Sequence, residues 1–318
     1  MDIIGGIIMT EHDKLIQSYY QNRGRRSARA KDWTMYQNAN PLTERAIMKT
    51  RRIGPDGLRG HCNIQVDQNP IHRVHIEQTT SEKFIWNHGN IHTRSDANSV
   101  VCKIRDDDFG KMCVLNFASF KNPGGKFLYG SSAQEESLCH FSNLYPVLAS
   151  MDDVYEEHCR NLRYGMYETD GLYTPNIAFY NPDDMMIQNI EFTTSTDLIE
   201  IDHVLCDVIT LAAPNYTLAR KYRNGDGAFV NAMQMRIRTI LDVANETDVD
   251  TLILGAYGCG VFGWDPTVVA NLFFQEIMTS GNARSVERFI FPIPDDRNYN
   301  AFRDAYEKAV NFANSAGL

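Results

Sequence analysis

Apolar runs that alternate with helical patterns constrain the fold of this chain more than any other feature of its sequence. From about residue 90 onward, runs rich in apolar, β-branched and aromatic residues occupy positions 112–118, 177–180, 203–213, 251–256 and 288–293. Helical periodicity occupies positions 228–247, 266–279 and 299–313. Strands that are apolar along their whole length are buried on both faces of a sheet. The order therefore predicts a three-layer α/β/α fold with a mixed, mostly parallel central sheet.

The first 88 residues have a different character from the rest of the chain. They are polar and irregular, with helical patterns at positions 11–20 and 42–49 and a turn signal at Gly54-Pro55-Asp56-Gly57. We therefore expect an N-terminal, partly helical extension over residues 1–88. It is expected to pack on a main domain formed by residues 89–318.

The charge of the chain is that of an acidic protein. Its 318 residues carry a formal net charge of −9, so we expect no direct contact with nucleic acid. A basic cluster at positions 23–31 permits two interpretations: a solvated arm, which we favour, or a contact with a polyanion. The seven cysteines are scattered and include no CxxC pair, which is typical of a reducing compartment.

The sequence predicts neither a targeting signal nor a membrane span. Residues 1–8 carry an acid where a secretory signal has a base, and no run reaches the ~20 apolar residues of a membrane helix. The densest histidines are His72, His75, His88 and His92. They lack the spacing of metal ligands, and we interpret them as surface or satisfied residues. We expect a soluble, cytoplasmic monomer without membrane contact, metal or cofactor.

A glycine-rich loop far along the chain is a candidate anion site. It reads Gly255-Ala256-Tyr257-Gly258-Cys259-Gly260-Val261-Phe262-Gly263. An apolar run precedes it, and Asp265 and Pro266 follow as the N-cap and first residue of a predicted helix. A strand, a glycine loop and a helix N-terminus together favour a phosphate. The alternative is a purely structural tight turn. The loop lacks the Lys-Ser/Thr of a Walker A motif and the GxGxxG frame.

Two adjacent acids behind a second glycine turn are the candidate catalytic groups. Asn122-Pro123-Gly124-Gly125-Lys126 is followed seven residues later by Gln134-Glu135-Glu136, and a helical pattern continues over positions 137–145. Neighbouring carboxylates repel, so holding them together suggests a use: one carboxyl holds a sugar hydroxyl and the other transfers a proton. Burial beside a second acid is expected to raise the pKa of one of them. The alternative is a charge pair in a first helical turn that faces solvent.

These residues resemble a known family. Asn-Pro-Gly-Gly followed by Gln-Glu-Glu-Ser-Leu-Cys is similar to the catalytic loop of bacterial-type poly(ADP-ribose) glycohydrolases, which are macrodomain proteins. The stretch from Gly255 to Pro266 resembles their diphosphate-binding loop, and residues 208–215 resemble the strand and turn between the two. Three separated motifs in the family's order cover roughly residues 90–310. The resemblance implies a macrodomain-like fold.

The resemblance also implies roles for particular residues. Glu136 would act on the glycosidic bond, and Glu135 would hold the hydroxyls of the reacting ribose. The implied substrate-binding residues are Asn122, Gly124, Gly125, Gln134, Gly258, Cys259, Gly260, Val261, Phe262 and Gly263. Lys126 stands where the family has a third glycine. A side chain at this position would narrow the cleft or change which leaving group fits beside the bond. We therefore expect it to affect activity on the polymer more than binding of ADP-ribose.

The implied function is hydrolysis of the ribose C1″ bond of poly(ADP-ribose) or of mono-ADP-ribosylated protein, which releases ADP-ribose without a metal. The alternative is a macrodomain that binds ADP-ribose without cleaving it, which is called a reader. Binding alone does not require two adjacent acids. A dinucleotide-dependent oxidoreductase would need a Rossmann frame near the N-terminus, and none is present there. For the adenine, Phe291, Tyr299 or Phe302 is a candidate for stacking. The alternative, which we favour, is that these residues belong to the core.

Overall fold

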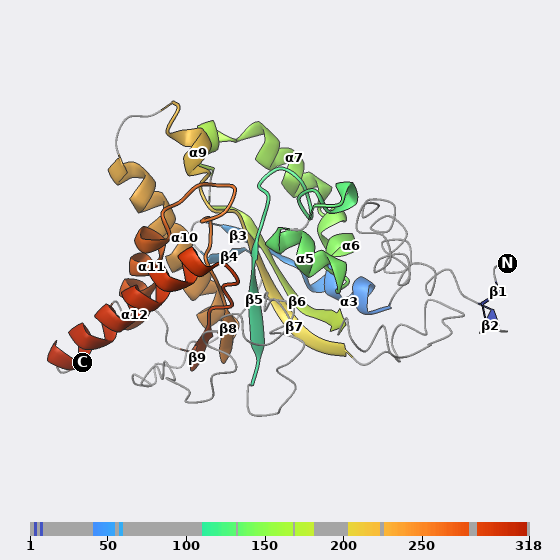
Figure 1. Cartoon of the computed structure of the whole chain (residues 1–318). Coiled ribbons are helices and arrows are strands. Elements are labelled where there is room, and N and C mark those ends of the chain that lie inside the picture. The colour runs from blue at the N-terminus through green and yellow to red at the C-terminus, as the bar shows by residue number, and fades with distance from the viewer. Residues whose placement is uncertain are drawn as a thin grey trace.

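A seven-stranded sheet forms the middle layer of the protein, seen here in a computed structural model (Figure 1). The described residues are 3–4, 7–8, 41–54, 57–59, 110–131, 133–167, 169–180, 203–222, 226–279 and 285–316. From one edge to the other, the strands are β4 (Gly57–Arg59), β3 (Arg51–Gly54), β6 (Gly171–Tyr180), β7 (His203–Leu211), β5 (Met112–Phe117), β8 (Thr251–Ile253) and β9 (Arg288–Ile290).

The sheet is mixed, as predicted. The parallel pairings lie on one side, where β7, β5, β8 and β9 follow one another. On the other side, β6 runs antiparallel to both β7 and β3, and β3 runs antiparallel to β4. The sequence predicted only residues 177–180 of β6, whereas the strand begins at Gly171 and changes register between Thr174 and Ile177.

Helices cover both faces of the sheet (Figure 1). One face carries α10 (Asp226–Glu246), α11 (Pro266–Phe274) and α12 (Asp296–Ala316). The other carries α3 (Pro41–Lys49), α5 (Gln134–His140), α6 (Leu144–Ala149) and α7 (Asp152–Arg160). The shorter elements are the 3₁₀ turns η3 (Phe127–Tyr129) and η4 (Arg163–Gly165), helix α9 (Tyr216–Ala219) and the π-helical turn η6 (Gln275–Thr279), which continues α11. The predicted three-layer α/β/α fold is therefore confirmed.

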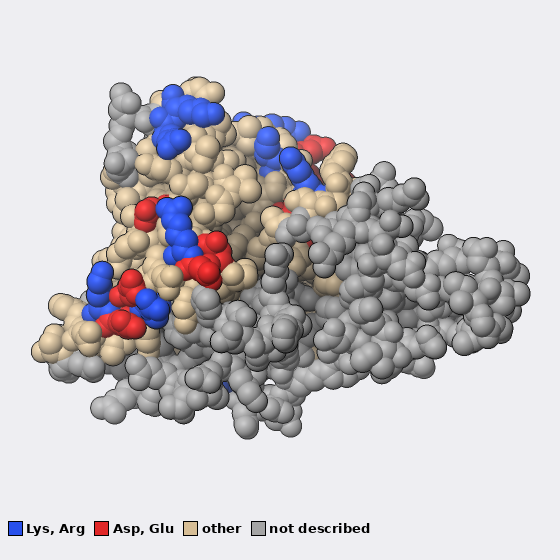
Figure 2. Space-filling view, viewed as in Figure 1, with Lys and Arg blue, Asp and Glu red and all other residues tan. Residues whose placement is uncertain are grey.

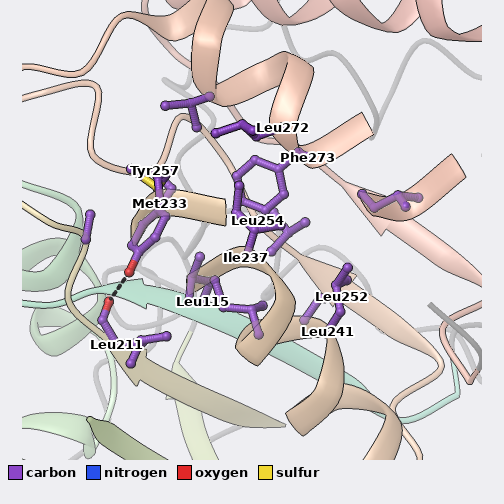
Figure 3. Close-up of a cluster of buried hydrophobic side chains, with 14 of the residues drawn as sticks. Leu115, Leu211, Met233, Ile237, Leu241, Leu252, Leu254, Tyr257, Leu272 and Phe273 are labelled. Carbon is purple, nitrogen blue, oxygen red and sulfur yellow. Dashed lines mark hydrogen bonds between the residues drawn. The ribbon is translucent and has the colours of Figure 1, made fainter. Parts of the chain in front are cut away.

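Each face of the sheet has its own hydrophobic core, because successive side chains of a strand point to opposite faces. Along β5, Cys113 and Leu115 belong to the core beneath α10, α11 and α12, and Met112 and Val114 to the core beneath α3, α5 and α6. In the first core, Ile237 of α10 and Phe273 of α11 lie over the strands (Figure 3). Strand β5 is thus fixed from both sides.

The N-terminal part contributes to this architecture. The predicted helix at 42–49 is confirmed as α3, and the turn signal at residues 54–57 joins β3 to β4 as a hairpin. Because β3 pairs with β6, this part of the expected extension is an edge of the main sheet. A separate short pair, β1 (Ile3–Ile4) with β2 (Ile7–Ile8), lies near the N-terminus. The boundary at residue 88 stays a prediction, and the helix at 11–20, the basic cluster at 23–31 and the four histidines lie outside the described residues.

The helix predicted over residues 137–145 is interrupted. Helix α5 ends at His140 and α6 begins at Leu144. Between them the backbone pairs with β6: Ser142 bridges Phe179, and Oδ1 of Asn143 accepts the N–H of Ala178 at 2.9 Å. Pairing with a strand edge replaces the helical hydrogen bonds at this point. Among the described helices, none combines the length and the apolar character needed to cross a membrane.

The carboxyl ends of β5, β7 and β8 meet at one edge of the sheet, since these strands are parallel. The loop after β5 holds the first glycine turn, and the loop after β8 holds the second. Tyr257 ties the second loop to the sheet: its ring is fully buried, and its hydroxyl donates to the carbonyl oxygen of Leu211 at 2.9 Å (Figure 3).

Tyr257→Phe removes that hydroxyl and keeps the ring, so we expect it to lower the free energy of unfolding by about 1 kcal/mol. Urea unfolding followed by circular dichroism measures the change. The control is Tyr222→Phe, because Tyr222 is 61% exposed and should tolerate the change. Equal stability of the two variants would show that the Tyr257 hydroxyl does not hold the loop.

Candidate active site

The acid pair lies in the first turn of α5, at the carboxyl end of β5. Glu135 and Glu136 are 3% and 5% exposed, so the interpretation as a solvent-facing charge pair is wrong. Gln134 attaches this helix end to the strand: its Oε1 accepts the N–H of Phe117, and its Nε2 donates to the carbonyl of Leu115, each at 2.8 Å. Gln134 thus bonds to β5 at both ends of its amide and fixes where the two acids stand.

Both carboxylate oxygens of Glu135 accept hydrogen bonds. Its Oε2 accepts the N–H of Ser119 at 2.7 Å, and its Oε1 accepts Nδ2 of Asn116 at 3.3 Å. Burial raises the pKa of Glu135 to about 8, and the nearby charge of Glu136 adds to the rise, against the lowering effect of the Ser119 N–H. The expectation of a raised pKa in the pair is therefore confirmed for Glu135.

Asn116 was not recognised as a site residue, although an amide in an otherwise apolar strand is a readable signal. The residue is fully buried, and its Nδ2 also lies 3.3 Å from Oγ1 of Thr210. Its Oδ1 atom has no hydrogen-bond partner among the described residues. The two ends of a side-chain amide exchange by rotation, so Asn116 is able to accept a hydrogen bond from the protonated carboxyl of Glu135 as well as to donate one to its carboxylate.

Glu136 is held from one side. Its Oε1 accepts the N–H of Lys126 at 2.8 Å, and within the described part of the chain its Oε2 receives no hydrogen bond. Gly125 lies against both acids: a Cβ atom there would come within 2.6 Å of Oε1 of Glu136 and 2.9 Å of Oε2 of Glu135. The φ of Gly125 is 62°, a conformation that side chains disfavour. Glycine is therefore required at this position by both geometry and space.

The loop that carries Gly125 is a compact turn. The carbonyl of Asn122 accepts the N–H of Gly125 at 2.9 Å, and the N–H of Asn122 donates to Oγ of Ser119 at 3.2 Å. Gly124 is buried against Tyr145 and Cys139, and its carbonyl accepts the N–H of Phe127. Asn122 itself is exposed, at the mouth of the turn.

The back of this loop is anchored to the N-terminal part of the sheet. The ring of His158 stacks on Phe120 at 4.1 Å between centroids, and its Nδ1 lies 2.9 Å from the carbonyl oxygen of Phe120. Nε2 of His158 lies 3.4 Å from Asp170, which pairs with Arg52 of β3. Burial would raise the pKa of Asp170, but hydrogen bonds from Arg52 and His158 outweigh it and lower the pKa to about 2. The predicted extension thus supports the candidate site.

The second glycine loop exposes backbone donors. The N–H groups of Gly258, Gly260, Val261 and Phe262 donate to no acceptor in the described part of the chain. Gly258 has a φ of 76°, and a Cβ atom there would lie 2.9 Å from Cδ1 of Trp264. Val261 stands at the tip of the loop and is 84% exposed. Successive unpaired N–H groups of this kind bind anions.

The N-terminus of α11 contributes less to this loop than the sequence suggested. Asp265 is the N-cap, as predicted, and its carboxylate accepts the N–H groups of Thr267 and Val268. The capping acid occupies the helix end, so the donors left for an anion are those of the loop itself. The expectation that the helix N-terminus attracts a phosphate is therefore not supported.

The rest of the loop is fixed to its surroundings. The indole of Trp264 donates to the carbonyl of Pro214 at 2.7 Å, and the carbonyl of Phe262 accepts the N–H of Thr217 at 3.0 Å. Gly263 packs directly on the side chain of Thr217. Cys259 is partly buried, and burial raises the pKa of its thiol to about 12, so it is no nucleophile at neutral pH.

An aromatic contact joins the two glycine loops. Tyr167 stacks on Phe120 at 4.4 Å between centroids and meets Phe262 edge-on at 6.2 Å. Sequence reasoning missed Tyr167, which lies in a segment without a periodic pattern and has a φ of 56°. Arg236 of α10, also missed, is 2% exposed and donates to the carbonyl of Ala212 at 3.1 Å beneath the same loops.

Two of the three aromatic candidates for adenine stacking lie in the core. Phe291 and Phe302 are 3% and 0% exposed, and their rings pack together at 5.6 Å in the core beneath α12. The core interpretation is confirmed for these two residues: Phe291 directly follows β9, Phe302 lies on α12, and both pack inside the core. Tyr299 is partly buried against the same core.

Basic side chains stand along the edge where the two loops lie. Figure 2 shows Lys and Arg along the upper edge of this view, above α9 and above the helices of the opposite layer. Arg220 and Lys221, just after α9, and Lys126 in the first loop are exposed. An anion approaching this edge therefore meets local positive charge despite the net charge of −9. Across the described residues, no group of three or more His, Cys, Asp or Glu is arranged to hold a metal ion.

Comparison with known proteins identifies one family. The family described as "Microbial-type PARG, catalytic domain" matches residues 17–181, just over half of the chain. The matched range includes the acid pair and the first glycine loop, and the second loop lies beyond it. No curated protein matches the chain in sequence.

Solved structures share the fold. The poly(ADP-ribose) glycohydrolase of Deinococcus radiodurans in complex with ADP-ribose has a TM-score of 0.60 and 23% identity, and the match covers 84% of this chain and 98% of that one. The enzyme of Thermomonospora curvata bound to the inhibitor ADP-HPD has a TM-score of 0.66 and 22% identity, with 90% and 99% covered. At this level of identity, the likeness establishes the fold.

The raised pKa of Glu135 predicts a pH-dependent stability. The folded state keeps a proton on Glu135 between the ordinary pKa of 4.5 and about 8, whereas the unfolded state releases it. The stabilisation is therefore complete below pH 4.5 and is lost as the pH rises through 8. Glu135→Gln has no such proton to lose. We therefore compare the unfolding free energy of Glu135→Gln with that of wild type. From pH 5 to pH 8.5, the value for the variant should rise relative to wild type by about 2 kcal/mol or more.

Urea unfolding of wild type and variant at pH 5, 6.5 and 8.5 measures this shift. Glu156→Gln is the matched control, because Glu156 is an exposed glutamate of α7. A difference between wild type and Glu135→Gln that stays constant from pH 5 to pH 8.5 would contradict the prediction.

Proposed function

The chain belongs to the family of microbial-type poly(ADP-ribose) glycohydrolases, and we propose that its acid pair and its second glycine loop together form the active site. Membership makes the chain a glycosidase that hydrolyses ADP-ribosyl bonds, which confirms the predicted enzyme over a non-catalytic reader. The observation that carries the assignment of roles is the difference between the two acids. Glu135 is fixed at both carboxyl oxygens, whereas Glu136 keeps Oε2 open beside it.

The proposed ligand is the ADP-ribose unit at the end of a polymer or on a modified protein. The Deinococcus radiodurans enzyme is described in complex with ADP-ribose, and the donors of this chain suit the same ligand. Its diphosphate would accept hydrogen bonds from the N–H groups of Gly258, Gly260, Val261 and Phe262. Phe262 would flank the ribose, and Gly124 and Gly125 would line the opposite side.

The reaction follows from the geometry of the acids. Glycosidic bonds break through an oxocarbenium-like transition state that needs a proton on the leaving oxygen. A carboxylic acid placed beside the leaving oxygen supplies this proton. Oε2 of Glu136 would deliver it, and C1″ would separate from the leaving group. As a carboxylate, Glu136 would then take a proton from the water that attacks C1″.

Glu135 would orient the ribose in this scheme. Its position is set by Ser119 and Asn116, so hydroxyls that bond to it are placed relative to Glu136. Fixed positioning of this kind lowers the barrier, because the entropy of alignment is lost before the reaction. Gln134 would contribute indirectly, because it attaches to β5 the end of the helix that carries both acids.

All residues proposed for the site belong to one chain, which supports the proposal of a monomeric enzyme. Both acids and both glycine loops come from the same sheet edge, and Tyr167 joins them. Cys113 and Cys139 are buried and form no disulfide within the described part of the chain, which fits the reducing cytoplasm that we propose as its location. We propose no contact with nucleic acid or with a membrane.

Glu136→Gln removes the proton donor and keeps the shape, so we expect release of ADP-ribose to fall by about 10²-fold or more. Release is measured from automodified polymer and from a mono-ADP-ribosylated protein. Calorimetry should show ADP-ribose binding retained. Glu156→Gln on the surface of α7 should behave as wild type. An unchanged rate in Glu136→Gln would contradict its assignment, and binding without release by wild type would contradict the enzyme.

Gly258→Ala tests the diphosphate loop. The new Cβ would meet Trp264 at 2.9 Å and Met233 at 3.1 Å at a φ of 76°, which displaces the donors. We expect the affinity for ADP-ribose, measured by calorimetry, to fall about tenfold or more.

Gly227→Ala is the control for this change, because a Cβ atom at Gly227 meets nothing within 4 Å. If Gly258→Ala binds ADP-ribose as tightly as Gly227→Ala, the diphosphate does not lie on this loop.

A further inference from the structure

A buried histidine behind the acids takes no part in the proposed reaction. His158 lies on α7 and is 5% exposed. Burying an imidazole costs free energy unless its nitrogens find partners, and a phenylalanine would fill the same space without that cost. Both ring nitrogens face polar groups: Nδ1 lies 2.9 Å from the carbonyl oxygen of Phe120, and Nε2 lies 3.4 Å from Oδ2 of Asp170. These two contacts distinguish the histidine from an apolar ring.

The orientation of the His158 ring is fixed from two sides. A carbonyl oxygen only accepts hydrogen bonds, so Nδ1 carries a hydrogen and donates it to Phe120. On the other side of the ring stands Asp170, which Arg52 of β3 holds with its Nε at 2.8 Å from Oδ1. The ring therefore cannot rotate without losing one contact or the other.

The bond from Nδ1 fixes the turn that holds Glu135. Phe120 directly follows Ser119, whose N–H donates to Oε2 of Glu135 at 2.7 Å. Oγ of Ser119 also accepts the N–H of Asn122 at 3.2 Å, so the turn moves as one piece. A displacement of the Phe120 carbonyl would therefore displace the donor that places Glu135, the group proposed to orient the ribose.

The ring of His158 leads to the second glycine loop. It forms one end of a stack of three rings, in which Phe120 lies between His158 at 4.1 Å and Tyr167 at 4.4 Å. The ring planes are 9° and 12° apart, so the three rings are nearly parallel. Tyr167 then meets Phe262 edge-on, and Phe262 packs against the small cluster that contains Phe120 and Tyr167. A change at the His158 end of the stack therefore reaches the ring proposed to flank the ribose.

We propose that His158 is a positioning residue for both halves of the site. Its Nδ1–H holds the turn that places Glu135, and its ring supports the stack that places Phe262. The inference rests on the proposed function, because it assigns the first contact to the chemical step and the second to the binding of ADP-ribose. Removing one contact at a time should therefore affect one stage more than the other.

His158→Phe keeps a ring in the stack and removes both nitrogen contacts. We expect kcat for release of ADP-ribose from automodified polymer to fall about five- to tenfold, since the donor to Glu135 is no longer held in place. The affinity for ADP-ribose, measured by calorimetry, should stay within about twofold of the wild-type value, because the stack remains.

His158→Asn makes the opposite change. Its amide nitrogen takes the place of Nδ1 and still donates to Phe120, whereas the ring is lost from the stack. The affinity for ADP-ribose should fall about fivefold, and kcat should change less than about twofold. A general structural role for His158 would lower kcat and affinity by similar factors in both variants, and that result would overturn the proposal.

Amide hydrogen exchange tests the turn without any reaction. We expect the N–H of Ser119 to exchange about tenfold faster in His158→Phe than in wild type, and at nearly the wild-type rate in His158→Asn. Glu156→Gln, an exposed change on the same helix, should match wild type in kcat, affinity and exchange. Unchanged exchange at Ser119 in His158→Phe would overturn the proposal.

Two further comparisons keep the outcomes apart. Urea unfolding shows that each variant is folded, and a general loss of stability cannot produce opposite effects on kcat and affinity in the two variants. If wild type releases no ADP-ribose, the proposed function fails, while hydrogen exchange at Ser119 still decides whether His158 holds the turn.

Discussion

Burial of two adjacent carboxyls at the carboxyl end of β5 is the constraint on which the rest of the site depends. Two buried carboxylates without compensation would be strongly unfavourable. In the described part, the hydrogen bonds to the pair come from backbone N–H groups and an amide, and no Lys or Arg side chain donates to it. A proton on Glu135 therefore removes one charge. Gly125 leaves room for both carboxyls, and Gln134 holds the helix end on which they stand.

The two faces of the sheet provide the two halves of the site. Helix α5, with the acids, belongs to the layer whose core includes Met112 and Val114, and the loop after β8 is fixed by the opposite core through Tyr257. Strand β5 lies between β7 and β8 and contributes to both cores. Tyr167 then joins the loops at the sheet edge through Phe120 and Phe262. The distance between the acids and the second glycine loop is thus set by the sheet on which both stand.

Much of this arrangement could be predicted from the sequence, for physical reasons that particular residues show. The apolar runs predicted β5, β7, β8 and β9, and the adjacency of Glu135 and Glu136 after a glycine turn predicted the acid pair. What escaped prediction depends on tertiary contacts. The antiparallel pairing of β6 and the break at Ser142 have no local signal. The role of Tyr167 follows from its contacts with Phe120 and Phe262, which are distant from it in the sequence.

The central claim is that one ADP-ribose spans the two loops, with its diphosphate on the second loop and its reacting ribose on the acids. A crystal structure of the Glu136→Gln protein with ADP-ribose tests this most directly. The account predicts diphosphate oxygens within hydrogen-bond distance of the N–H groups of Gly258 to Phe262. It also predicts ribose hydroxyls on Glu135, with C1″ facing residue 136. A diphosphate bound elsewhere, or a ribose turned away from both acids, would contradict it.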